Sequence, residues 1–190
     1  MTKAELRKKN LAERSALTEA VYLQYSRQIA DNFFMGIDVA FIKVLHIFIP
    51  IEQKREPNTW LIIDRIRREY PHIRLVLPRV NSDTGLLENF FYEGIHQLQK
   101  NNWNILEPKQ GVPAEIEKID MVLIPLLAFD LQGQRVGYGK GFYDKFLVHC
   151  KPECKRIGLS LTEAVEQIDD LNPFDIPLHG CVTPTQVYSF

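Results

Sequence analysis

Residues 135–144, RVGYGKGFYD, are the stretch whose residue types best fit a defined chemistry. Backbone N–H groups can converge on an anion without an intervening Cβ at Gly137, Gly139 and Gly141. Arg135 can hold two phosphate oxygens in its planar fork, and Lys140 adds a mobile point charge; each charged hydrogen bond is worth about 1.5–3 kcal/mol. Asp144 would repel a polyanion unless Mg²⁺ lay between them, because Mg²⁺ joins carboxylates to phosphate oxygens and water. The stretch therefore predicts a site for a magnesium-bound phosphate chain.

Two familiar phosphate-binding patterns do not fit this stretch. A dinucleotide fingerprint starting at Gly137 would need glycine at position 142, where the chain has Phe142. A P-loop ending at Lys140 would need glycine at position 134 and Ser or Thr at position 141, where the chain has Gln134 and Gly141. The sequence supports neither a NAD enzyme nor a P-loop NTPase, and a glycine-rich surface turn with nearby charges stays open as the alternative.

The composition of the chain is that of an ordinary globular protein. Of its 190 residues, 45% are hydrophobic and 25% charged, and 23 basic residues balance 24 acidic ones. This balance gives no global positive field, so we expect binding neither to nucleic acid nor to a membrane. The longest apolar run, residues 121–129, is too short to span a bilayer, and the N-terminus has no signal core, which favours the cytoplasm.

The cysteines carry no paired spacing of a zinc site or redox motif; they are Cys150, Cys154 and Cys181. We interpret them as reduced and structural, with a reactive thiol as the alternative.

Hydrophobic periodicity predicts helices and strands in alternation. One helix begins after Thr2, which can form a capping box with Glu5, and another begins after Thr18. The second helix should bury one face, made of Val21, Tyr25, Ile29 and Phe33. Buried strands are predicted at residues 43–51, 73–78, 85–93, 120–125 and 155–160, and further helices at 58–70 and 141–150.

This alternation predicts the fold class. We expect an α/β fold of three α/β/α layers around a mostly parallel, Rossmann-like sheet, and a single domain over residues 1–190. Ligands of such sheets bind at the carboxyl ends of strands, in the loops that lead into helices. Residues 135–144 follow the strand at 120–125 and lead into the helix at 141–150, whose N-terminus adds partial positive charge.

The segment DMVLIPLLAFDLQGQRVGYGKGFYD, residues 120–144, resembles the characteristic motif of the 5-formyltetrahydrofolate cyclo-ligase family, also called methenyltetrahydrofolate synthetase. That motif is an apolar strand, proline, a short link to Phe-Asp, and then G-x-R-[LV]-G-x-G-x-G-x-Y-D. The matching positions are Gly133, Arg135, Gly137, Gly139, Gly141, Tyr143 and Asp144. Five further segments resemble family elements in the same order: KAELR at 3–7, EPNT at 56–59, LPR at 77–79, NNWNILEP at 101–108 and FDIPLHGCVTP at 174–184.

The resemblance implies a reaction: ATP- and Mg²⁺-dependent closure of 5-formyltetrahydrofolate to 5,10-methenyltetrahydrofolate, with release of ADP and phosphate. The formyl oxygen attacks the γ-phosphate, and the resulting iminium phosphate is closed by N10. Such phosphoryl transfer needs in-line positioning and charge cancellation. The resemblance assigns these tasks to the catalytic residues Arg135, Lys140 and Tyr143. It implies a folate substrate, with or without a polyglutamate tail, and we expect a monomer.

The resemblance also implies which residues bind ATP and the metal. It places ATP against Lys3, Arg7, Arg135, Gly137, Tyr138, Gly139, Lys140, Gly141, Phe142 and Tyr143. From spacing alone Lys3 and Arg7 share a helix face, for which a solvated terminal helix is the alternative. The metal ligands would be Asp144 and Asp175; for Asp175 a turn aspartate before Pro177 is the alternative.

The folate-binding residues implied by the resemblance are Phe48, Ile49, Glu56 and Trp103. For Glu56 the alternative is a carboxylate that merely complements the dipole of the helix it begins. Trp103 lies in a polar stretch, where it could stack on a ligand ring or anchor a loop. The chain departs from the family pattern at four peripheral positions, namely Val80, Leu126, Phe174 and His179.

Two other function classes stay open. A regulatory nucleotide-binding module would keep the glycine stretch without a second cavity, and a small-molecule kinase would release a phosphorylated product.

Overall fold

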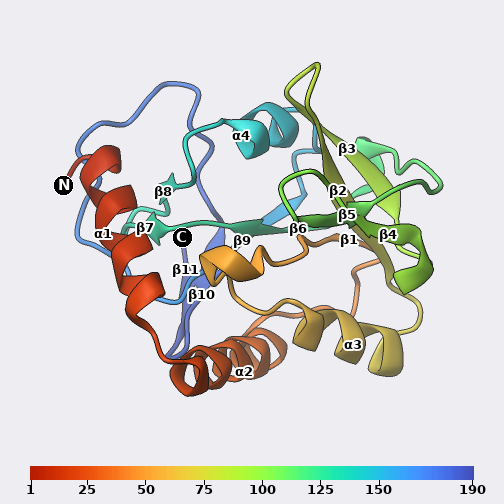
Figure 1. Cartoon of the computed structure of the whole chain (residues 1–190), viewed down its shortest axis with the longest axis horizontal. Helices are drawn as coiled ribbons and strands as arrows, with labels where there is room; N and C mark the ends of the chain where they lie inside the picture. The colour runs from red at the N-terminus through yellow and green to blue at the C-terminus, as the bar shows by residue number, and fades with distance from the viewer.

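A single seven-stranded sheet forms the centre of the computed structural model, which describes all 190 residues (Figure 1). Its strand order is β11-β10-β9-β6-β1-β2-β3. The strands are β1 (Val44–His46), β2 (Arg74–Asn81), β3 (Leu86–Phe91), β6 (Met121–Pro125), β9 (Lys155–Leu159), β10 (Gly180–Val182) and β11 (Val187–Ser189). The five inner strands are mutually parallel, and the edge strands β3 and β11 are antiparallel to their neighbours. The predicted mostly parallel α/β sheet is confirmed.

Helices cover both faces of this sheet. They are α1 (Lys3–Ala16), α2 (Glu19–Gly36), α3 (Trp60–Glu69) and α4 (Phe142–Leu147), with short 3-10 turns η1 (Glu52–Lys54), η2 (Ile95–Gln97) and η3 (Ile116–Lys118). Figure 1 shows α2 and α3 on one face and α4 on the other. Two apolar cores correspond to these faces: Phe33 and Ile63 belong to the larger, and Phe146 to the smaller. No helix is both long and apolar enough to cross a membrane.

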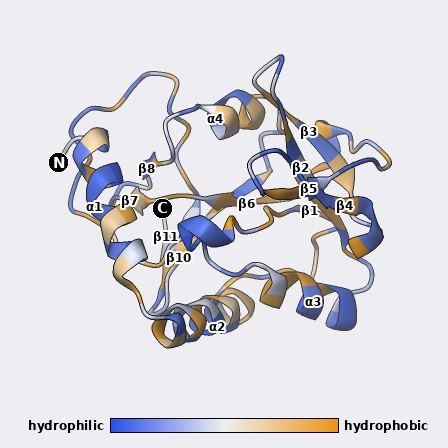
Figure 2. Ribbon diagram, in the orientation of Figure 1, coloured by the Kyte–Doolittle hydropathy of each residue, from blue (hydrophilic) through white to orange (hydrophobic).

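The ends of the first two helices lie where the sequence predicts them. Thr2 and Glu5 form the capping box of α1, and the Thr18 hydroxyl accepts a hydrogen bond from Val21 N at the start of α2. The predicted face of α2 is partly wrong, because the helix is rotated: it buries Ile29 and Phe33, together with Tyr22, Ser26 and Ala30, and leaves Val21 and Tyr25 only partly buried. Hydrophobic and hydrophilic colours accordingly alternate along α2 and α3 in Figure 2.

Two small hairpins lie outside the main sheet. The first joins β4 (Leu98–Lys100) to β5 (Leu106–Pro108), and the second joins β7 (Ala128–Phe129) to β8 (Arg135–Val136). In the second hairpin the buried Asp130 carboxylate accepts hydrogen bonds from the backbone N–H groups of Gln132, Gln134 and Ile168. These bonds fix the turn that delivers the chain to Arg135.

The strand order reverses beside β1. The chain passes from β1 to β2 on one side, and the later strands β6, β9 and β10 continue on the other. The loops that leave the carboxyl ends of β1 and β6 therefore diverge, which opens a crevice at the usual ligand position of such sheets. The loop after β1 carries residues 47–59, and the connection after β6 carries residues 126–141.

Candidate functional site

The glycine loop, residues 137–141, has a backbone that two of its glycines make possible. Gly139 and Gly141 have φ angles of 89° and 69°, in the left-handed region that disfavours other residues. A Cβ on Gly139 would also lie 3.4 Å from the Arg7 guanidinium. Gly137 has no positive φ and a free space around its missing Cβ, so its contribution is a carbonyl that accepts a hydrogen bond from Arg7 Nε at 2.8 Å.

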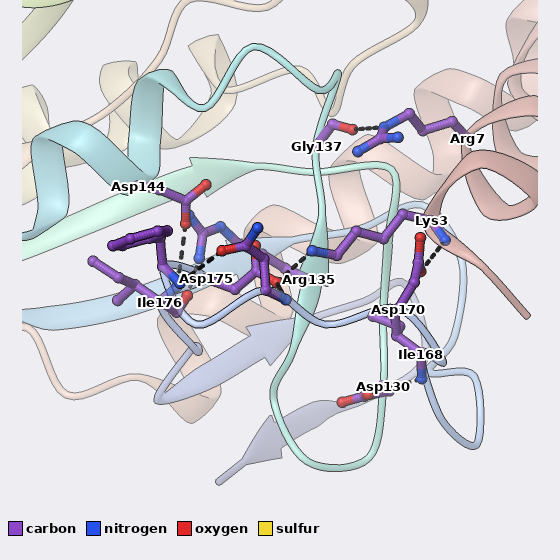
Figure 3. Close-up of polar contacts among 12 residues, drawn as sticks. Lys3, Arg7, Asp130, Arg135, Gly137, Asp144, Ile168, Asp170, Asp175 and Ile176 are labelled. Carbon is purple, nitrogen blue, oxygen red and sulfur yellow. Dashed lines mark hydrogen bonds and ion pairs between the residues drawn. The ribbon is translucent and has the colours of Figure 1, made fainter.

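Helix α1 packs against this loop. Its buried Leu6 joins a small apolar cluster with Ala128 and Val136 of the second hairpin. This packing brings Arg7 to the loop, while the Lys3 ammonium forms an ion pair with Asp175 (Figure 3). The interpretation of α1 as a solvated terminal helix is wrong, because one face of it is buried at Leu6, Asn10 and Arg14.

A network of ion pairs closes the other side of the loop. Arg135, nearly buried, donates from Nη2 to Asp144 Oδ1 at 2.6 Å and from Nη1 to the carbonyl of Ile176. The same Asp144 oxygen accepts a hydrogen bond from Ile176 N at 3.1 Å. Figure 3 shows Asp144 and Asp175 approaching the same region from two segments. Arg135 is thus committed to protein groups, and it holds the C-terminal segment against α4.

The two acids fit a magnesium ion held largely by a ligand's phosphates. Asp144 uses Oδ1 for its protein contacts and leaves Oδ2 without a protein partner; Asp175 uses Oδ2 for Lys3 and for Asn172 N, and leaves Oδ1. The chain has no cluster of three or more metal-binding side chains. Free carboxylate oxygens are the kind of ligand that Mg²⁺ takes, usually one or two of them, with phosphate and water completing its shell. Asp175 is also a turn aspartate, which was the alternative interpretation of this residue, because its Oδ2 accepts the hydrogen bond from Asn172 N.

A small cavity of about 100 Å³ lies at the glycine loop. It is lined by Pro125, Arg135, Gly137, Tyr138, Gly139, Lys140, Gly141, Phe142, Tyr143 and Asp144. Lys140 is exposed and forms no ion pair or side-chain hydrogen bond within the chain. Its ammonium is therefore the free cation of this cavity.

A second, larger cavity of about 860 Å³ adjoins the first. Both cavities are lined by Pro125, Tyr138, Lys140, Phe142 and Tyr143. The larger one brings together all four residues that the sequence predicts for the folate, Phe48, Ile49, Glu56 and Trp103. About half of its lining residues are hydrophobic, 11 of 21, which suits a flat aromatic ligand.

Glu56 is the buried acid of the large cavity. It is only 2% exposed, and its Oε2 accepts a hydrogen bond from Ile51 N at 2.7 Å. Burial raises the pKa of this carboxyl, while the Ile51 bond, Tyr138 and Arg14 oppose the shift. The helix-dipole interpretation is wrong, because α3 begins only at Trp60 and Glu56 lies in the loop before it.

Trp103 lies at the mouth of the large cavity. Its side chain is 68% exposed, so it does not anchor its loop in a core. Asn101 does that instead, because its Oδ1 accepts hydrogen bonds from Trp103 N at 2.9 Å and from Ile105 N at 3.1 Å. The Trp103 ring is left free to contact a ligand.

Tyr143 belongs to both cavities but turns its hydroxyl inward. The hydroxyl oxygen is buried without a hydrogen-bond partner, and desolvation, followed by the charge of Glu56, raises the pKa of the phenol. The ring packs edge-on against His46, with centroids 6.0 Å apart. Burial lowers the pKa of His46 to about 3, so this histidine is neutral at physiological pH.

Sequence reasoning missed two charged residues beside the large cavity. Arg14 is 2% exposed and directs Nη1 to the Tyr138 hydroxyl and Nη2 to the carbonyl of Leu126. Its position, seven residues after Arg7 on the same helix face, was the available signal. The Lys54 ammonium lies 4.1 Å from the centre of the Tyr138 ring, and nothing in its polar sequence context distinguishes it.

The chain is similar to known proteins over most of its length. Residues 1–184 match the model of the 5-formyltetrahydrofolate cyclo-ligase family. The 5-formyltetrahydrofolate cyclo-ligase of Escherichia coli K12 is 28% identical over 182 residues, which covers 93% of this chain and 97% of that protein. The enzyme of the same name from Mycoplasma pneumoniae is 29% identical, over 94% of this chain and 96% of its own length.

The fold of the chain is similar to that of a solved structure. The NMR structure of Aquifex aeolicus 5,10-methenyltetrahydrofolate synthetase superposes with a TM-score of 0.83 at 28% identity, covering all of this chain and 93% of that one. A match to the family model over nearly the whole chain, together with the fold shared with this solved structure, is sufficient to assign the chain to a family. The chain belongs to the 5-formyltetrahydrofolate cyclo-ligase family.

Proposed function

We propose that this protein uses ATP and Mg²⁺ to close 5-formyltetrahydrofolate to 5,10-methenyltetrahydrofolate, with release of ADP and phosphate. The observation that carries the proposal is the junction of the two cavities, where Lys140 and Tyr143 line both. A reaction that transfers a phosphoryl group from one ligand to another needs two adjoining cavities with a cation at their boundary.

The proposed reaction has two chemical steps, phosphoryl transfer to the formyl oxygen and closure of the ring by N10. The formyl oxygen attacks the γ-phosphorus of ATP, the new P–O bond forms, and the bond to the β-phosphate oxygen breaks to release ADP. The folate is then an iminium phosphate, in which the former formyl oxygen has become part of a leaving group. N10 attacks the iminium carbon, phosphate departs with that oxygen, and N10 loses its proton.

Lys140 is the residue placed to stabilise the moving phosphoryl group. Its ammonium has no protein partner and faces both cavities, so that it can follow charge as the γ-phosphate crosses from one ligand to the other. The N–H groups of the glycine loop add donors at fixed positions. Arg135 acts by holding Asp144, and bound Mg²⁺, held by Asp144 and Asp175, would neutralise part of the phosphate charge.

The large cavity is proposed to hold the pterin and aminobenzoyl rings. Glu56 would accept hydrogen bonds from ring N–H groups, while Phe48 and Ile49 supply apolar contact. Trp103 would cover the rings from the mouth. This assignment needs no movement of the backbone, because all four side chains already line one cavity.

A direct assay tests the proposal. Purified protein is mixed with 5-formyltetrahydrofolate, ATP and Mg²⁺, and the near-ultraviolet absorption of the methenyl product is followed together with ADP release. We expect one ADP for each methenyl group formed. ADP release with a phosphorylated product and without the methenyl chromophore would replace this proposal by that of a small-molecule kinase.

A further inference from the structure

The hydroxyl of Tyr138 lies between two charged groups that come from different parts of the chain. Tyr138 belongs to the glycine loop and lines both cavities, and its phenol hydroxyl reaches the Arg14 guanidinium. Arg14 Nη1 donates to this hydroxyl over 3.5 Å. Tyr138 and Glu56 line the same large cavity, and the charge of Glu56 adds to burial in raising the pKa of the phenol.

Each of these partners is itself fixed in place. Arg14 is buried and held by the Leu126 carbonyl, and Glu56 is buried and held by Ile51 N. Tyr138 follows Gly137 and precedes Gly139, whose φ is 89°, so its backbone is part of the glycine loop. The Lys54 ammonium over its ring, at 4.1 Å, favours the inward position of the phenol.

The contact to Arg14 is at the long end of hydrogen-bond distances, so it can still shorten. Hydrogen bonds of this kind often tighten only when ligands bind. Tyr138 lines both cavities, whereas Glu56 lines only the large one. A ligand that contacts Tyr138 from the small cavity therefore acts on a side chain that also borders the large cavity.

We propose that Tyr138 is a positioning residue. Its hydroxyl, held between Arg14 and Glu56, makes nucleotide binding in the small cavity (the nucleotide cavity) and folate binding in the large cavity (the folate cavity) depend on each other. The inference rests on the proposed function for the identity of the two ligands. Its physical content is a coupling free energy, which must act equally in both directions. Coupling of this kind typically changes affinity by roughly 5–150-fold.

The first test measures coupling with both ligands. The dissociation constant of Mg²⁺-AMP-PNP, a non-transferring ATP analogue, is determined by calorimetry with and without saturating 5-formyltetrahydrofolate. We expect the folate to tighten nucleotide binding at least about fivefold in the natural chain. In Tyr138→Phe, which keeps the ring over Lys54 and removes only the hydroxyl, we expect that ratio to fall to within about twofold of one.

Tyr22→Phe is the matched control. The Tyr22 hydroxyl donates to the main-chain carbonyl of Glu56 at 2.8 Å, so this variant removes a buried phenol bond to the same residue without touching the glycine loop. It should keep the coupling ratio of the natural chain. A ratio of one in the natural chain, or a Tyr138→Phe ratio equal to that of Tyr22→Phe, would overturn the inference.

The second test needs no folate. Mg²⁺-AMP-PNP binding is measured for Glu56→Gln, Tyr138→Phe and the double variant. We expect Glu56→Gln to weaken nucleotide binding several-fold although Glu56 does not line the nucleotide cavity, and to have no effect once the Tyr138 hydroxyl is gone. If Glu56→Gln weakens nucleotide binding equally with and without the Tyr138 hydroxyl, the proposed coupling is wrong. Since the methenyl assay alone decides the reaction, failure of the proposed function and failure of this inference are told apart.

Discussion

The small cavity is enclosed by main chain and ion pairs, whereas about half of the residues that line the large cavity are hydrophobic and surround one buried acid. Around the small cavity, Lys3, Arg135, Asp144 and Asp175 tie the two ends of the chain and the start of α4 together. Around the large cavity, Trp103 and Val80 are exposed and support little else. Side chains of the first region serve structure and ligand together, while the exposed Trp103 and Val80 of the second are free to serve the ligand alone.

This difference predicts how variants should divide. Changes to the ion pairs of the small cavity should lower both turnover and stability. Changes to Glu56 or Trp103 in the large cavity should alter folate affinity and leave stability unchanged or higher, because neither belongs to the hydrophobic core. Lys140 is the exception on the small side, because it has no protein partner to lose.

Lys140→Ala should give the largest loss. Removing a preorganised charge at a transferring group typically costs about 10²–10³-fold in kcat. Because Lys140 is exposed and unpaired, the melting temperature should stay that of the natural chain. Steady-state kinetics and calorimetric melting measure the two effects. Lys145→Ala, another exposed lysine that lines neither cavity, is the control, and equal activity of the two variants would remove Lys140 from the mechanism.

Asp144→Asn should lose activity and stability together. Loss of metal partners costs about 10–100-fold in activity. The nearly buried Arg135 would also lose its counter-charge, so we expect a melting temperature lower by several degrees, as a loss of about 1–2 kcal/mol would give in a domain of this size. In magnesium titrations the Asp144→Asn variant should need a higher Mg²⁺ concentration for half-maximal activity. Asp83→Asn, on an exposed turn, should change neither activity nor melting temperature. An unchanged melting temperature would contradict the structural role.

Glu56→Gln should separate affinity from stability. Loss of a charged hydrogen bond to the folate should raise its KM by about tenfold or more. Burial raises the pKa of Glu56 in the folded protein, so its stabilising contribution is complete below the ordinary pKa and is lost as pH rises through the folded value. The neutral amide avoids that loss.

The pH dependence of this effect has a definite sign. The melting temperature of Glu56→Gln should exceed that of the natural chain at pH 7, and the difference should shrink as the pH is lowered toward 4. A variant less stable than the natural chain at pH 7 would show that the carboxylate is compensated by its neighbours Arg14 and Lys54.

Trp103→Ala should give the smallest effect. A lost aromatic contact of about 0.5–1.5 kcal/mol corresponds to a rise in folate KM of roughly 2–10-fold. The ring is mostly exposed, so kcat and melting temperature should not change. Trp103→Phe should restore most of the affinity. An unaltered KM in the alanine variant would exclude the ring from the folate site.

Much of the small cavity could be predicted from the sequence, because its residues are contiguous. Three glycines, a lysine and an aspartate within residues 135–144 indicate a phosphate loop wherever the rest of the chain lies. The partners of that loop could not be predicted, because Lys3, Arg7 and Ile176 reach it from more than thirty positions away along the chain. The commitment of Arg135 to Asp144 is a property of this long-range packing.

Most of the sheet was predictable, including its edge strand β3, but the two strands at the other edge, β10 and β11, were not. A continuous apolar run marks β6 and shorter apolar segments mark β2, β3 and β9, whereas β10 and β11 have three residues each and show no periodicity of their own. The strand predicted at 43–51 is ordered as β1 only over Val44–His46, because the chain then turns out toward Glu56. That acid was misplaced at a helix start for the same reason: the loop is longer than the sequence suggests.

The exposed position of Trp103 has a practical use. The chain has two tryptophans, and the other, Trp60, lines neither of the two cavities. Indole emission depends on polarity and stacking around the ring, so folate entry should change the fluorescence of Trp103 while that of Trp60 provides a constant background. Replacing Trp60 by phenylalanine would leave one reporter at the folate entrance, and the filling of that cavity could then be followed in real time without a label.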